Sequence, residues 1–347
     1  NILPETLSAL STVTISGEIQ NHQNQKIDDF NGILFPTIFD KALEAFTLGN
    51  DEKSSVQKFY QRNNIIFNGQ SKINNGTFKF SFVVPKDIKL FYDAGKISYF
   101  ALSEDGVAAK GCLQNLIIGG IAENALVDNT PPAIQLFMNN EDFSFGGITN
   151  ENPDLLVKLY DDSGINTAGG GIGHNITCVL DDDDANAIVL NNFYKAAPNN
   201  YKNGVAIYPF NNLTEGKHNL RVRAFDIHNN WSEANLTFEV QLQTNAVITG
   251  LSNYPNPFNS ETTFSFEHNQ SDDNLMAQID VYNLTGQKIR SIQQNIANNG
   301  FKVISMKWNG EDEQSYPIST GTYVYRVTLI NKEQTFLSDF QKLMFLR

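Results

Sequence analysis

One stretch decides the fold of this 347-residue chain: Asn74-Asn75-Gly76-Thr77-Phe78-Lys79-Phe80-Ser81-Phe82-Val83-Val84-Pro85. The Asn-Asn-Gly segment turns the chain, and Phe78, Phe80 and Phe82 then occupy alternate positions. Alternate side chains of a β-strand point to one face, so the three aromatic rings predict a strand with one buried face.

The same alternation recurs outward from this stretch in both directions. It is present in Ser11–Ile19, Lys96–Leu102, Leu155–Tyr160, His218–Asp226 and Leu236–Val240. Phe and Thr are plentiful and the chain has only 4 Met and 2 Cys, a composition that favours strands and turns over helices. Ile38–Leu48 is the one candidate helix. We predict an all-β fold of tandem β-sandwich, immunoglobulin-like domains.

The length suits two or three domains. Val127-Asp128-Asn129-Thr130-Pro131-Pro132 predicts a stiff linker, because two prolines cannot continue a central strand. Turn signals return near Asn245. We therefore predict β-sandwich domains over residues 1–126, 127–245 and 246–347. In the third we expect strands at Thr262–Phe266, Ala277–Tyr282, Val303–Trp308, Thr322–Ile330 and Gln334–Phe345.

Charge and hydropathy limit the partners. A net charge of −13 argues against nucleic acid and anionic membrane surfaces, which attract basic proteins. No apolar run reaches the roughly 18 residues that a membrane helix needs. The chain begins with neither Met nor a signal peptide, so we expect Asn1 to be a cut end with more protein upstream.

The sequence predicts no catalytic residue. Cys178 follows His174 by four positions, but along a strand this spacing places them roughly 13 Å apart, too far for a hydrogen bond. We expect Cys112 and Cys178 to be buried free thiols, and a disulfide between domains stays open. Gly169–Gly173 lacks the Lys-Ser/Thr of a phosphate-binding loop, so we interpret it as a loop that needs positive φ.

Calcium is the one cofactor that the sequence raises. Four consecutive carboxylates, Asp181–Asp184, cannot all point inward, and a solvated turn is the simpler interpretation. Asp161, Asp162 and Asp226 are the better calcium candidates, since they follow strands and strand-end loops gather such ligands.

The last hundred residues carry motifs in a distinctive order. They are Leu251-Ser252-Asn253-Tyr254-Pro255-Asn256-Pro257-Phe258, Ile279–Ile289, Met306–Gly310 and Ser319–Val327. In order and spacing they resemble the C-terminal sorting domain of the Bacteroidetes type IX secretion system. Its motif positions here are Pro255, Asn256, Pro257, Gly286, Gly321 and Tyr323. The resemblance implies export to the cell surface and docking on an outer-membrane carrier protein, with Gly321 setting a tight turn and Tyr323 anchoring the core. Thr335–Leu346 is long and apolar, and it either offers a strand edge to that carrier or completes its own sandwich; the sequence leaves both open.

A second resemblance covers nearly the whole chain. It rests on Ser163–Thr177, Leu190–Tyr194, Phe225–Asn230, Asp29–Gly32 and Phe78–Ile88. These stretches are similar to the β-domains that follow the protease core in the type IX sortase of the gingipain-type cysteine peptidase family. No stretch matches the His and Cys of that core. The resemblance thus implies the non-catalytic C-terminal part of a surface sortase, whose parent protein removes sorting domains from cargo.

Two other functions stay open. A secreted adhesin or carbohydrate-binding sandwich could use Trp231 and Tyr201 as a stacking platform. The chain could also belong to another type IX cargo, such as a hydrolase.

Overall fold

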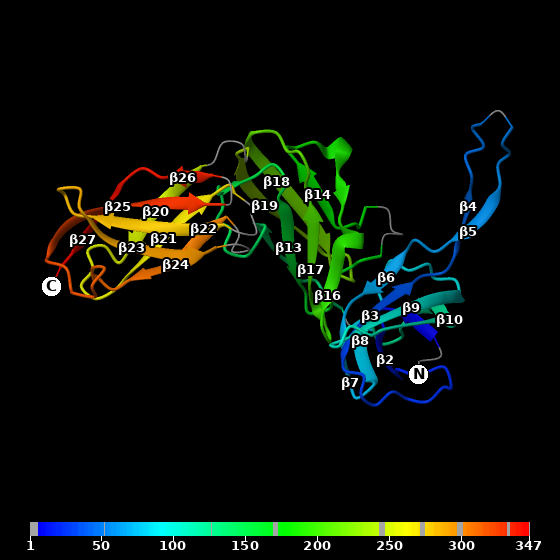
Figure 1. Ribbon diagram of the computed structural model, residues 1–347. Coiled ribbons are helices and arrows are strands. Elements are labelled where there is room, and N and C mark those ends of the chain that lie inside the picture. Colours follow the sequence, from blue (N-terminus) through cyan, green and yellow to red (C-terminus); the bar gives the residue numbers. More distant parts are fainter. Residues whose placement is uncertain are drawn as a thin grey trace. The chain divides into compact units, whose positions relative to one another are not determined.

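The computed structural model describes residues 6–51, 53–125, 127–168, 173–242, 247–270, 275–296, 301–331 and 334–346, without the side chains of Ile304 and Ser305. Within these ranges the chain forms β-strands, two short 3-10 turns (Asp184–Asn186 and Asn191–Phe193) and no α-helix (Figure 1). The predicted all-β class is confirmed. The chain divides into two compact units, one made of residues 1–136, 157–208 and 220–235, the other of residues 137–156, 209–219 and 236–347. The predicted division into three domains stays a prediction.

The N-terminal sheet has eight strands in the order β1-β10-β9-β3-β7-β8-β2, with β6 also paired to β3. Their bounds are β1 (Thr6–Ala9), β2 (Thr12–Glu18), β3 (Gly32–Phe39), β6 (Ile65–Asn68), β7 (Ser71–Asn74), β8 (Thr77–Val83), β9 (Asp93–Ser103) and β10 (Ala108–Ile121). Strand β8 is the stretch with alternating Phe, and Phe78, Phe80 and Phe82 are all buried as predicted. The ring of Phe67 stacks on that of Phe82 at 4.7 Å, so these aromatic residues form the centre of the core.

A two-stranded hairpin leaves this sheet between β3 and β6. It consists of β4 (Leu43–Phe46) and β5 (Lys58–Gln61), which pair only with each other (Figure 1). The helix considered over Ile38–Leu48 is therefore wrong. The end of β3 and all of β4 occupy that segment, because pairing with β5 satisfies the backbone groups that a helix would have bonded internally.

Two sheets follow along the chain. One has the order β11-β13-β17-β16 and the other β12-β19-β18-β14-β15. Their strands are β11 (Ala133–Met138), β12 (Ile148–Thr149), β13 (Asp154–Tyr160), β14 (Thr177–Leu180), β15 (Ile188–Val189), β16 (Tyr194–Ala197), β17 (Asn200–Pro209), β18 (Gly216–Phe225) and β19 (Trp231–Val240). Leu155, Val157 and Leu159 are buried in alternation along β13, which explains the period of two in the sequence.

The C-terminal strands form a sandwich with its own hydrophobic core. One sheet is β20-β21-β24, and the other is β23-β22-β25, to which both β26 and β27 pair. The strands are β20 (Ile248–Tyr254), β21 (Thr262–His268), β22 (Met276–Tyr282), β23 (Lys288–Asn295), β24 (Lys302–Trp308), β25 (Gly321–Ile330), β26 (Thr335–Leu337) and β27 (Gln341–Phe345). The two sheets enclose a cluster that includes Phe264, Ile279, Trp308, Tyr325 and Leu343. Two strands, β20 and β23, were not predicted from the sequence, and the single strand expected over Gln334–Phe345 is two strands.

Candidate functional site

The segment Tyr254–Phe258 binds the last strand of the chain. The Asn256 side chain accepts a hydrogen bond from the Met344 amide (2.9 Å) and donates one to the Lys342 carbonyl (3.2 Å). The Phe258 amide donates to the Met344 carbonyl (3.0 Å), and the Phe258 carbonyl accepts from the Leu346 amide (2.8 Å). The outer edge of β27 is thus already paired within the domain. The alternative in which this part of Thr335–Leu346 offers a free edge is wrong.

The buried ring of Phe258 also fixes the Tyr254–Phe258 segment to the domain core. The Phe258 ring packs on Trp308 at 5.5 Å and on Phe345 at 5.1 Å between ring centroids. Gly310, in a turn at φ +73°, lies so close that an added Cβ would be 2.7 Å from the Phe345 ring. The side chains of Tyr254, Pro255, Asn256 and Pro257 stay exposed above this packing. Tyr254–Phe258 is thus an exposed surface segment, which is fixed by hydrogen bonds to β27 and by the packing of Phe258 on an aromatic cluster.

An acidic group lies in the N-terminal unit. One ligand atom each of Asp128, Asp226 and His228 falls within 4.8 Å of the others, so these three could hold a metal ion. Buried Asp161 lies near them. Burial raises the pKa of Asp161 to about 6, and the charge of Asp226 adds to this rise. A hydrogen bond from the Ser163 hydroxyl lowers the pKa of Asp128.

Of the calcium candidates, the structure brings Asp161 and Asp226 together but not Asp162. The Asp162 carboxylate is exposed, bonds the Lys202 ammonium at 2.9 Å and accepts from the Tyr160 hydroxyl, and these bonds lower its pKa. Sequence reasoning missed Asp128 because it lies in the Pro-Pro linker and not after a strand. Calcium binding stays a prediction.

The remaining candidates lie apart from one another. His174 Nδ1 bonds the Asp87 carboxylate at 2.7 Å, whereas Cys178 is buried in β14 and its pKa is raised to about 12 by that burial. Both cysteines are free, but Cys112 is exposed, so the expectation of two buried thiols is wrong for that residue. Asp181–Asp184 forms an exposed turn. Of the glycine-rich loop, residues 169–172 lie outside the described residues.

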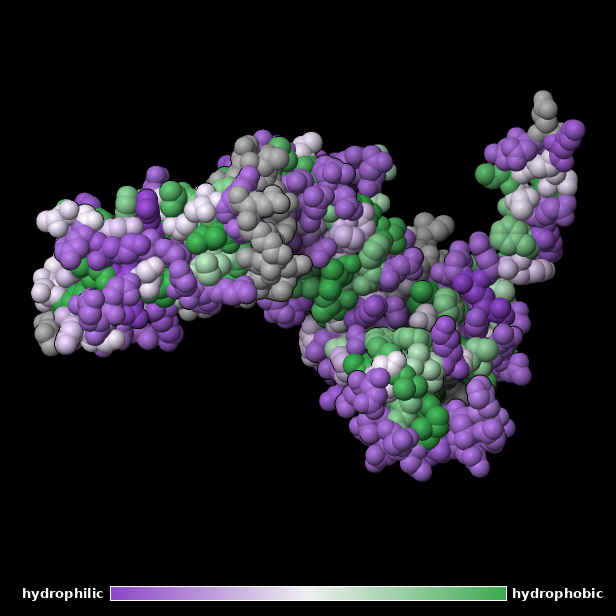
Figure 2. All heavy atoms as spheres, in the orientation of Figure 1, coloured by the Kyte–Doolittle hydropathy of each residue, from purple (hydrophilic) through white to green (hydrophobic). Residues whose placement is uncertain are grey.

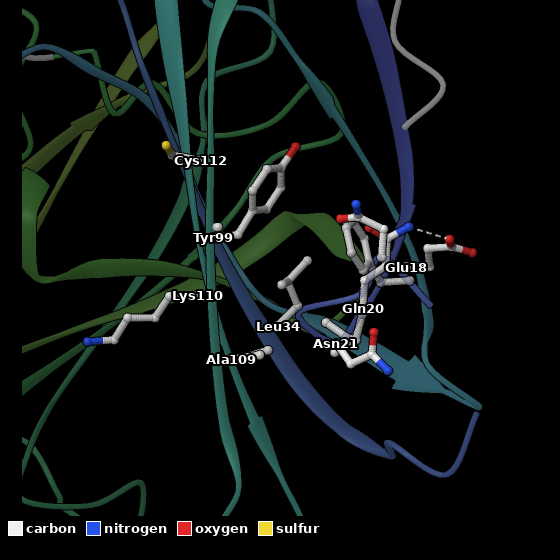
Figure 3. A pocket seen from close by; sticks show the side chains of 13 residues that line it. Glu18, Gln20, Asn21, Leu34, Tyr99, Ala109, Lys110 and Cys112 are labelled. Carbon is white, nitrogen blue, oxygen red and sulfur yellow. Dashed lines mark hydrogen bonds between the residues drawn. The ribbon is translucent and has the colours of Figure 1, made fainter. Parts of the chain in front are cut away.

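A cavity of about 320 Å³ opens beside the N-terminal sheet, next to Cys112. Figure 3 shows Tyr99 and Leu34 directed toward the space in front of Glu18 and Gln20, while Lys110 points away from it. The Tyr99 hydroxyl is buried without a hydrogen-bond partner in the described part of the chain, and burial raises its pKa to about 12. The cavity therefore has an apolar floor, an uncharged hydroxyl and a rim of polar side chains.

Comparison with known proteins gives one family match, to the model described as "Secretion system C-terminal sorting domain", over residues 252–336. Residues 252–336 are a secretion-system C-terminal sorting domain. A sorting domain of this kind marks a protein for export by the type IX secretion system to the cell surface or outer membrane. Across the described ranges, no helix is long and apolar enough to cross a membrane.

Solved structures were also compared. The crystal structure of dimeric latent PorU from Porphyromonas gingivalis is 26% identical, with a TM-score of 0.40, covering 98% of this chain and 32% of that one. This chain thus spans about a third of the PorU chain. A tetra-tandem repeat from the extending region of a large adhesion protein is 12% identical (TM-score 0.24, covering 98% and 73%). The chicken CNTN1 FN1–FN3 domains are 12% identical (TM-score 0.23, covering 97% and 94%). No curated protein matches the chain.

The other motif residues of the sorting domain have separate structural roles. Gly286 lies in the turn between β22 and β23 at φ +84°, a conformation that favours glycine. Tyr323 is buried and its hydroxyl donates to the Ser319 carbonyl at 2.8 Å, as expected of a core anchor. Gly321 opens strand β25 opposite Phe345 and has no left-handed φ, so the tight turn expected there is wrong.

Proposed function

We propose that this chain is the non-catalytic C-terminal part of a cell-surface type IX sortase of the gingipain-type cysteine peptidase family. It braces the protease core of the parent protein and docks that protein to outer-membrane partners. The observation that carries the proposal is the sorting domain, folded around its own core and joined to β-domains whose sequence resembles this family. Cys178 is buried and His174 bonds Asp87, which supports the non-catalytic assignment.

A second observation supports the bracing role. The outer face of the N-terminal sheet carries apolar side chains in register across two strands: Ile33 lies opposite Leu102, and Phe35 opposite Phe100. Ile33, Leu102 and Phe100 are exposed, and Phe35 is half-buried. Figure 2 shows hydrophobic atoms gathered on the visible surface of the region that this sheet forms. Contiguous exposed apolar area marks an interaction site, and a protease core would cover such a face.

One of the two aromatic residues on which the adhesin alternative rests, Trp231, has a ring face covered. The guanidinium of Arg223 lies over the Trp231 ring, 4.7 Å from the centroid. That face of the ring is therefore covered by a cation and is not free to stack on a sugar.

The test is to isolate the native protein from the outer membrane of the producing bacterium and to sequence it by mass spectrometry. We expect peptides of residues 246–347 together with peptides of a cysteine peptidase domain upstream of Asn1. A protein recovered from the medium, without a peptidase domain and with residues 246–347 removed, would refute the sortase assignment.

A further inference from the structure

Three side chains meet on the outer face of the larger sheet of the sorting domain. Tyr282 ends β22, Arg326 lies in the middle of β25, and Phe340 lies between β26 and β27. The Arg326 guanidinium carbon is 5.9 Å from the centroid of the Tyr282 ring and 5.3 Å from that of the Phe340 ring. The two rings meet edge to face at 5.8 Å. The guanidinium is thus held against two aromatic rings.

Arg326 has no anionic partner among the residues that the structure describes, and its Nε is buried without a hydrogen-bond acceptor. Asp280 is its register partner on β22 but is committed elsewhere. It bonds Lys288 at 3.1 Å and Gln278 at 3.0 Å, and it is buried. The chain has a net charge of −13, so a guanidinium without a carboxylate partner is unusual in it.

The residues around Arg326 are typical of a surface that binds another protein. Lys342, on β27, is a second cation on this face and makes no ion pair within the described part of the domain. Phe340 and Leu337 are 54% and 56% exposed, and Met344 is also exposed. Exposed apolar groups around an unpaired arginine match the composition of interface centres, which are rich in aromatic residues, Met and Arg.

We propose that this face, formed by Tyr282, Arg326, Leu337, Phe340 and Lys342, docks an acidic loop of an outer-membrane carrier protein. One carboxylate of that loop pairs with Arg326, and its apolar neighbours cover Phe340 and Leu337. The planar guanidinium bonds a carboxylate through two parallel N–H groups, and the flanking rings hold it in place before binding, so little side-chain entropy is lost. Charge complementarity selects the acidic partner. The proposal rests on the proposed function, since it names the surface through which the sorting domain docks.

The test uses the full-length protein in the producing bacterium, with a photo-crosslinking amino acid in place of Leu337. In the wild-type background we expect a crosslink to an acidic loop of an outer-membrane protein, which mass spectrometry identifies. Arg326→Glu should reduce the crosslink and surface delivery at least tenfold. Replacing the crosslinked acidic residue of the partner by Arg should restore both. Arg326→Lys should be intermediate because Lys keeps the charge but loses the two-pronged geometry.

The matched control is Lys307→Glu, which reverses a charge on the other sheet, where Lys307 pairs with Glu261 at 2.9 Å; it should stay within twofold of wild type. Should Arg326→Glu unfold in a thermal melt, Arg326→Gln replaces it. A folded Arg326 variant that crosslinks as strongly as the wild-type protein would overturn the proposal. So would Arg326-dependent binding of purified protein to phosphatidylglycerol vesicles without a protein crosslink, which would make the ligand a lipid. Deleting residues 246–347 separates the two claims: normal delivery after that deletion defeats the proposed function itself.

Discussion

The terminal strand β27 and the hairpin β4–β5 are both short strands with large apolar side chains, yet they are held in opposite ways. β27 pairs with β25 on one edge and with the Asn256–Phe258 segment on the other, and it buries Leu343 and Phe345. Every residue of β5 is exposed, and β4 and β5 have only each other as strand partners. β27 is therefore stabilised along its whole length, whereas the hairpin has no core of its own.

The hairpin is instead fixed by the buried polar residues that flank its two ends. Asp40 and Lys41 lie just before it and are almost completely buried, with Lys41 Nζ 2.8 Å from the Asp40 carboxylate. Lys41 also donates to the Lys89 carbonyl, and Asp40 accepts from Asn64, which lies just after the hairpin. Substitutions should therefore destabilise the hairpin most at the buried polar residues beside it, and β27 most at its buried apolar side chains.

The largest effect is expected from Asp40→Ala, which leaves the Lys41 ammonium buried and unpaired. Breaking a buried ion pair by removing one partner costs about 3–5 kcal/mol of unfolding free energy. Urea denaturation of the purified chain measures the loss. The matched control is Asp28→Ala, which removes the exposed partner of Lys26 and should cost under about 0.5 kcal/mol. Equal effects of the two variants would remove the basis of the comparison.

Phe258→Ala tests the other half of the comparison. It removes the ring between Trp308 and Phe345, and such truncations cost about 3–4 kcal/mol. We expect amide hydrogen exchange to speed up in β27 more than in β22. Uniform acceleration across the domain would show that the segment does not hold β27 specifically.

Stability at acid pH extends the comparison, because the sorting domain buries a neutral histidine, whereas the N-terminal unit buries an ion pair. Burial lowers the pKa of His268 to about 4. Between about pH 6.5 and 4 the unfolded state binds more protons than the folded state, so stability falls as the pH falls. The full loss is about 3 kcal/mol. His268→Gln should flatten this part of the stability profile of the chain, and an unchanged slope would contradict the assignment.

The smallest effect is expected from a double substitution in the hairpin, Phe46→Ser with Tyr60→Ser. Both side chains are exposed, so the unfolding free energy should change by less than about 0.5 kcal/mol. A loss of several kcal/mol in urea denaturation would mean that the hairpin shares a core with the rest of its unit.

The sequence predicted what depends on local periodicity and missed what depends on distant contacts. The alternation of Phe78, Phe80 and Phe82 needs only one buried face, and the turn at Gly286 needs only a positive φ. Pairing of Asn256 with β27 joins residues 88 positions apart, and no local pattern encodes it. The same holds for Asp128, which tertiary folding brings beside Asp226. It also holds for Arg326, whose Nε has no hydrogen-bond partner among the residues that the structure describes.

The central claim is that residues 246–347 form an export signal that acts as a folded sandwich. The direct measurement places these residues after a fluorescent reporter with a signal peptide, in a bacterium that has a type IX secretion system. External protease then measures how much reporter lies on the cell surface. We predict that the wild-type fusion reaches the surface and that a fusion carrying Phe258→Ala is delivered less. A wild-type fusion that stays in the periplasm would contradict the claim.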